Sequence, residues 1–100
     1  MTLTITEEND TVIGTLEGRL DTTASAQFAK DMQPLIDNAD KHILLDCEKL
    51  AFISSSGLRL LLTLRKEAMN KGGDVTIKNV STEVKQVFTI TGFYSLFQFA

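Results

Sequence analysis

Three consecutive serines, Ser54 to Ser56, precede Gly57 at the point where an apolar, strand-like run gives way to a leucine-rich helical run. The first backbone N–H groups of a helix have no partner within it, and the helix dipole places partial positive charge there. A serine at this point can cap the helix, and an anion, bound or made by phosphorylation, is favoured there. The local sequence alone favours one serine as the helix cap and the others as turn residues.

The sequence contains no recognisable catalytic or metal-binding set. His42 is the only histidine and stands among charged residues, where a solvated side chain is expected. A serine hydrolase needs a base and an oxyanion hole, and its Gly-x-Ser-x-Gly signature is absent. A glycine-rich nucleotide loop and a cluster of metal ligands are also absent. We therefore expect no catalytic activity, no metal and no cofactor.

Length and composition predict one globular domain over residues 1–100. A chain of this length with 43% hydrophobic and 23% charged residues can form a core without disulfide bonds or metal ions. The only cysteine, Cys47, lies in an apolar run and is expected to be a small core residue. The net charge of −3, without a basic cluster, argues against nucleic acid as a partner.

The sequence offers no candidate membrane segment. No apolar run approaches the ~20 residues that a membrane helix needs. The first six residues alternate between apolar and polar, which is typical of a strand and not of a signal peptide. We expect a cytoplasmic protein without membrane insertion.

Hydrophobic periodicity predicts the element order β-β-α-β-α-β-α, with a short final strand as an option. Two strands around a polar turn, the second at 11–17, predict an antiparallel hairpin. Later strands alternate with helices, which predicts parallel pairing. The expected fold is an α/β domain with a mixed sheet of four to five strands, packed with three to four helices.

Several local features carry further expectations. Residues 18–23 are expected to break the second strand, and Pro34 to kink or end the helix that follows it. The apolar run 43–45 predicts a strand covered on both faces. The helix at 58–64 is apolar nearly all round, so it is either buried on most sides or offers a face to a partner. The aromatic residues of 93–99 either dock onto the core or form an exposed patch.

Three passages resemble the STAS domain, and specifically the stand-alone anti-sigma factor antagonists of bacteria. Residues 18–24 resemble the family's glycine–x–leucine–aspartate turn after the second strand. Residues 44–58 are similar to its signature, an apolar strand leading to phenylalanine, isoleucine, aspartate, two serines, glycine and leucine. Residues 78–97 resemble its last strand and helix, with a threonine–glycine ending. The resemblance runs nearly end to end and implies the STAS fold.

The resemblance also implies a protein–protein switch. Family members bind an anti-sigma factor that is also a serine kinase of the GHKL type, which frees a sigma factor. The kinase phosphorylates the serine before the signature glycine, here Ser56, with Ser55 as second choice, and a phosphoserine phosphatase reverses the step. The partner-binding residues implied by the resemblance are Asp21, Ser54, Ser55, Gly57, Leu58 and Arg59.

One departure from the family pattern concerns the first residue of the serine turn. The family usually has aspartate where this chain has Ser54. Serine can still cap the helix, but the surroundings of the phosphoacceptor are less acidic. Asp21 is open to two interpretations, a plain helix cap or a residue of the partner-binding surface.

An alternative function within the same fold does not involve phosphorylation. Some STAS proteins are accessory subunits of membrane transport ATPase complexes or scaffold members of stress-signalling assemblies. The leucines of 58–64 could serve such a partner. The sequence also leaves open whether the free protein is a monomer or a weak dimer.

Overall fold

The computed structural model describes all of residues 1–100. The strands are β1 (Thr2–Glu8), β2 (Thr11–Leu20), β3 (His42–Ile53), β4 (Asp74–Lys78) and β5 (Gln98–Phe99). The helices are α1 (Thr22–Asp31), α2 (Gln33–Asp37), α3 (Ser55–Lys71) and α4 (Thr82–Ile90), and Tyr94–Leu96 form one 3-10 turn, η1.

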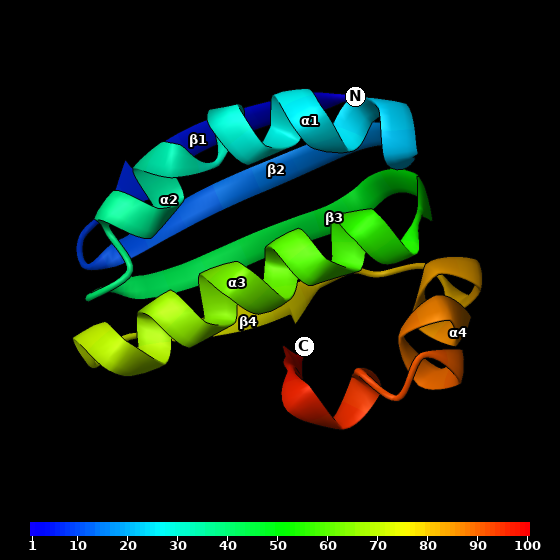
Figure 1. The fold of residues 1–100 in the computed structure, drawn as a ribbon. Coiled ribbons are helices and arrows are strands. Elements are labelled where there is room, and N and C mark those ends of the chain that lie inside the picture. The colour runs from blue at the N-terminus through cyan, green and yellow to red at the C-terminus, as the bar shows by residue number, and fades with distance from the viewer.

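The strands form one mixed sheet in the order β1-β2-β3-β4-β5. β1 and β2 pair antiparallel, and the other neighbours pair parallel. Figure 1 shows α1, α2 and α3 lying over one face of the sheet, with α4 beside the end of β4. This architecture confirms the predicted fold class, including the opening hairpin and the short final strand. None of the helices combines the length and the hydropathy of a membrane-spanning segment.

The helices cover one face of the sheet, which corrects one expectation about β3. Ile43 and Leu45 are buried under the helices at 1% and 0% exposure, but Leu44 between them remains partly exposed. Successive strand residues point to opposite faces, so the alternation shows that only one face of β3 is covered. The prediction of a strand covered on both faces is therefore wrong.

The second strand continues beyond its predicted end. Residues 18–20, expected to break it, remain paired with β3, and Leu20 lies opposite Ile53. The pairing register shifts around Gly18, whose φ of 102° suits glycine. The prediction of a break was wrong because an irregular strand can keep its partners.

The predicted effect of Pro34 is confirmed. Helix α1 ends at Asp31, and Pro34 stands in the first turn of the short helix α2, where its missing N–H costs nothing. The chain therefore bends between the two helices, and both still pack against the sheet (Figure 1).

The C-terminal aromatic residues dock onto the core. Phe88 of α4 makes edge-to-face contacts with Phe97 and Phe99, with ring centroids 5.5 and 5.4 Å apart. Phe97 is 8% exposed, whereas Leu96 keeps 36% of its surface exposed. Docking, one of the two expected outcomes, is therefore the observed one for the phenylalanines.

Candidate functional site

The carboxyl ends of β2 and β3 lie side by side and place the starts of α1 and α3 next to each other. The backbone N–H of Ser54 donates to the carbonyl oxygen of Leu20 at 2.8 Å, which extends the strand pairing to the last residue. Because each strand turns directly into a helix, the two helix N-termini emerge at the same edge of the sheet. We call this place the serine corner, consisting of Asp21, Ser25, Ser54, Ser55 and Ser56.

Both helices begin with a side-chain cap. Asp21 Oδ1 accepts a hydrogen bond from the backbone N–H of Ala24 at 2.8 Å. Ser54 Oγ accepts one from the N–H of Gly57 at 3.2 Å. Each cap pairs an N–H that the helix leaves unpaired. The interpretation of Asp21 as a helix cap is therefore confirmed.

Three serine hydroxyls form a hydrogen-bonded chain between the two helices. Ser54 Oγ lies 2.9 Å from Ser56 Oγ, and Ser56 Oγ lies 3.0 Å from Ser25 Oγ. Ser25 Oγ then donates to the carbonyl oxygen of Asp21 at 2.8 Å. No buried side-chain nitrogen or oxygen of the protein lacks a hydrogen-bond partner. The chain joins the first turn of α3 to the first turn of α1.

The residues of the serine corner differ in exposure. Ser55 is exposed, and Ser54, Ser56 and Asp21 are partly exposed. The first turn of α3 contains no acidic side chain. The Ser56 hydroxyl therefore stands near the positive end of a helix dipole with no carboxylate in that turn, where added negative charge is tolerated.

Other candidate groups lie away from this corner or are chemically inert. His42 Nδ1 is 3.0 Å from both carboxylate oxygens of Asp74, at the opposite end of β3 from Ser54. Burial raises the pKa of the Cys47 thiol to about 12, so it is protonated at neutral pH. No group of three His, Cys, Asp or Glu side chains could hold a metal ion.

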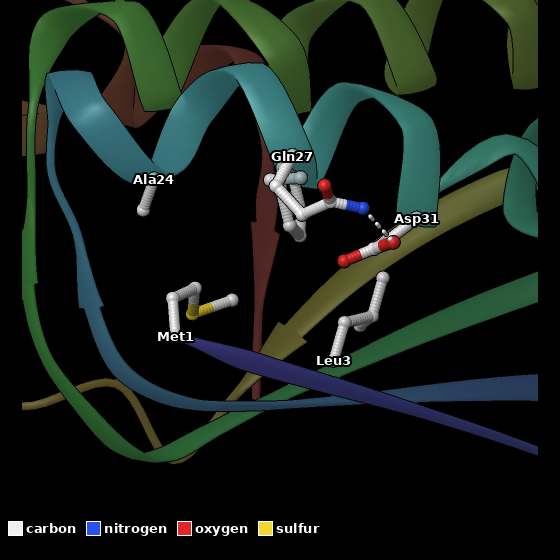
Figure 2. Close-up of a pocket in the computed structure, with 6 residues that line it drawn as sticks. Met1, Leu3, Ala24, Gln27 and Asp31 are labelled. Carbon is white, nitrogen blue, oxygen red and sulfur yellow. Dashed lines mark hydrogen bonds between the residues drawn. The ribbon is translucent and has the colours of Figure 1, made fainter.

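A small hollow between β1 and α1 is separate from the serine chain. Figure 2 shows Gln27 and Asp31 at its rim, where Gln27 Nε2 donates to Asp31 Oδ1 at 2.8 Å. Its volume of about 140 Å³ is below the ~300 Å³ of a typical ligand pocket. The hollow contains no histidine, cysteine or serine, and its lining residues are Met1, Leu3, Ala24, Gln27, Phe28 and Asp31.

The sequence profile of the STAS domain matches residues 2–100. The chain belongs to the STAS domain family. Among its relatives, BtrV of Bordetella bronchiseptica, provisionally assigned as an anti-sigma factor antagonist, is 29% identical over 100 residues, which cover all of this chain and 86% of BtrV. The anti-sigma F factor antagonist of Paenibacillus polymyxa is 29% identical over 82 residues, covering 81% of this chain and 70% of that protein.

Solved structures agree with this assignment. The anti-sigma factor antagonist SpoIIAA in its unphosphorylated form superposes with a TM-score of 0.79 at 26% identity, covering 99% of this chain and 88% of SpoIIAA. The phosphorylated form of SpoIIAA from Bacillus gives a TM-score of 0.72 at the same identity, covering 99% of this chain and 91% of that one. SpoIIAA thus shares the fold of this STAS domain in both states.

Two residues expected in the partner-binding surface of this STAS domain are buried instead. Leu58 is 0% exposed and belongs to the core. Gly57 is also buried, and an added Cβ would lie 2.7 Å from Leu20 Cγ and 3.1 Å from Ile53 Cγ1. The resemblance implied contact with a partner, but Leu58 points into the core and Gly57 lies against Leu20 and Ile53, so both residues serve packing. Arg59, the next residue, is exposed.

The leucine-rich helix is buried on one side. Leu61 and Leu64 are 0% exposed like Leu58, while Leu60 and Leu62 are partly exposed. Of the two expectations for this helix, burial therefore accounts for most of its apolar side chains.

Sequence reasoning missed Ser25, the only buried polar residue of this STAS domain, at 8% exposure. A signal was available, because Ser25, Phe28 and Met32 follow helical spacing and share the buried face of α1. A hydroxyl on that face requires a polar partner, and it has two, the carbonyl oxygen of Asp21 in its own helix and the hydroxyl of Ser56 in α3.

Proposed function

We propose that this STAS domain is an anti-sigma factor antagonist that binds an anti-sigma factor serine kinase and is released when Ser56 is phosphorylated. The proposal is supported by the relatives named anti-sigma factor antagonist and by SpoIIAA, known in unphosphorylated and phosphorylated forms. The observation that carries it is the place of Ser56, a partly exposed residue in the first turn of α3.

The physical effect of phosphorylation at Ser56 is to add charge without unfolding the domain. The phosphate would carry about −1.5 to −2 charge near the positive end of α3, where the fold can hold it. At a docked surface, like charges that meet cost several kcal/mol. A loss of about 3–4 kcal/mol weakens binding roughly 10²–10³-fold, which is enough for a switch.

Ser56 is the proposed phosphoacceptor and Ser55 the second choice. The proposed contact surface comprises the exposed or partly exposed residues around it, namely Asp21, Ser54, Ser55 and Arg59. A phosphoserine phosphatase returns Ser56 to the binding form. Because sigma factors act on RNA polymerase, this exchange takes place in the cytoplasm.

The proposed role is one of binding, not catalysis. His42 lies at the opposite end of β3 from the serine corner, so it does not serve Ser56 as a base. Incubation with activated esters is expected to show no turnover that Ser56→Ala abolishes. Such turnover would contradict the proposal.

Intact-mass analysis with the partner kinase and ATP tests the phosphorylation step. Wild type and Ser55→Ala are expected to gain one phosphate, and Ser56→Ala none. Ser55→Ala is the matched control because Ser55 is the exposed neighbour in the same helical turn. A phosphate that persists in Ser56→Ala would move the site to Ser54 or Ser55, and an unmodified wild type would remove phosphorylation from the proposal.

Binding measurements test the switch itself. Ser56→Asp is expected to lower affinity for the kinase, with Ser56→Ala close to wild type, because only the former adds charge. Circular dichroism checks that both variants stay folded. If Ser56→Asp binds as tightly as wild type, charge at Ser56 is not the switch. Capture of a transport ATPase in place of a kinase would favour the alternative function.

A further inference from the structure

Ser25 connects the phosphoacceptor to the neighbouring helix. Its side chain belongs to α1, is 8% exposed, and lies 3.0 Å from Ser56 Oγ across a sequence separation of 31 residues. Such burial prevents Ser25 from contacting a docked protein directly. Any influence of Ser25 on Ser56 must therefore pass through the hydrogen bond between the two hydroxyls.

The direction of the serine chain follows from counting hydrogens. Ser25 Oγ has one hydrogen, which it donates to the carbonyl oxygen of Asp21 at 2.8 Å. In the bond with Ser56, Ser25 therefore accepts, and the single Ser56 hydrogen points to Ser25. Ser56 must then accept from Ser54, whose Oγ also accepts from the N–H of Gly57. Each hydroxyl hydrogen is used once.

This arrangement leaves the Ser56 oxygen ready to act as a nucleophile. Its hydrogen is directed toward α1, one lone pair accepts from Ser54, and the second lone pair is uncommitted. In phosphoryl transfer from ATP, that oxygen forms a bond to the γ-phosphorus, and the bond from the γ-phosphorus to the departing ADP oxygen breaks. As that bond forms, the Ser56 hydrogen leaves its hydrogen bond with Ser25 and passes to a general base of the kinase. Ser25 cannot keep this proton, because its hydroxyl oxygen already carries one.

We propose that Ser25 is the positioning residue of the Ser56 hydroxyl, holding it in one rotamer with its hydrogen turned toward α1. The inference deepens the proposed function and rests on it for its biological meaning. Without Ser25, the Ser54–Ser56 bond loses its fixed direction, because either hydroxyl can then donate, and the Ser56 side chain loses one of its two anchors.

Nuclear magnetic resonance measures this positioning without any partner. Three-bond couplings between Hα and Hβ report the χ1 rotamers of Ser56. One rotamer is expected in wild type and a mixture in Ser25→Ala. Thr23→Ala is the matched control, because Thr23 holds the position in α1 that Ser56 holds in α3 and is exposed. A single, unchanged Ser56 rotamer in Ser25→Ala would overturn the proposal.

Steady-state phosphorylation by the partner kinase gives a second readout. Ser25→Ala is expected to lower kcat about two- to ten-fold, the worth of one ordinary hydrogen bond. The KM for the domain should stay unchanged, because a buried residue makes no contact with the kinase. An unchanged kcat, or a raised KM with kcat preserved, would contradict the positioning role.

A second variant guards against a folding defect. Ser25→Cys keeps nearly the same volume but replaces the hydroxyl with a weak acceptor, so it should loosen Ser56 in the same way as Ser25→Ala. Thermal unfolding checks both variants. If the kinase fails to modify wild type, the proposed function fails, while the rotamer measurement still supports or overturns the role of Ser25.

Discussion

The two helices that meet at the serine corner begin with matching positions and different residues. Helix α1 starts at Thr22 after its cap Asp21, and α3 starts at Ser55 after its cap Ser54. The cap of α1 is the carboxyl group of Asp21, whereas the cap of α3 is the hydroxyl of Ser54. One helix start therefore has an acidic cap and the other a neutral one. In the serine corner, the start of α1 therefore carries a constant negative charge on Asp21. The start of α3 has a neutral cap, and its charge changes when Ser56 is phosphorylated, as proposed above.

The largest loss of stability is expected at the fourth position of α3, Leu58, whose counterpart in α1 is Ser25. Leu58→Ala should reduce the free energy of unfolding by about 2–5 kcal/mol, because it opens a cavity in the core. Arg59→Ala, at the exposed neighbour, should change it by less than about 0.5 kcal/mol. Urea denaturation measures both. If Leu58→Ala lowered the free energy of unfolding only slightly and abolished partner binding, Leu58 would have to be part of the contact surface.

At the third helical position the two helices favour opposite residues, glycine in α3 and alanine in α1, so replacing either one is expected to destabilise the domain. Gly57→Ala places a Cβ 2.7 Å from the buried Leu20 Cγ and should cost about 1–3 kcal/mol. Alanine already occupies the equivalent position in α1, and Ala24→Gly should cost about 0.5–1 kcal/mol through helix propensity, besides the contact that Ala24 makes with the core. Thermal and urea unfolding compare them. If Gly57→Ala stabilises the domain, as in an open helix, the close packing against Leu20 is refuted.

The smallest expected effect is a difference between the two caps in how their contribution to stability depends on salt. Asp21→Ala and Ser54→Ala should each cost about 0.5–2 kcal/mol. Part of the Asp21 contribution is charge–dipole attraction, so its loss should shrink in high salt, while that of Ser54 should not. Denaturation at low and high salt measures this difference. Equal salt dependence would show that both caps act through hydrogen bonding alone.

The parts of the fold that depend on local sequence could be predicted. Pro34 ends a helix through its own ring, and Gly72, the glycine after α3, forms a left-handed cap with φ of 84°, a conformation that glycine favours at a helix end. Ser81 caps α4 by accepting from the N–H of Val84, and serine is a favoured residue at that position. Each feature is decided within one turn of chain, so the sequence carries the information.

The parts that depend on distant partners could not be predicted. Residues 18–20 contain a glycine and resemble a break, but pairing with β3 keeps them in the sheet. Which side of α3 is buried depends on Leu20, Ile53 and the neighbouring helix, so Leu58 was placed at the surface. The Ser25–Ser56 bond joins two helices; the spacing within α1 places Ser25 on the buried face, but it does not identify Ser56 as a partner.

Parallel pairing of β2 and β3 has a consequence for when the corner exists. Leu20 and Ile53 are partners in the sheet, yet α1 and α2 lie between them in the chain. Such non-local contacts form late because long loops must close first. A chain in which β2 and β3 have not yet paired presents Ser56 without its contact to Ser25. An enzyme that recognises the assembled serine corner therefore distinguishes folded copies of the domain from copies that have not finished folding.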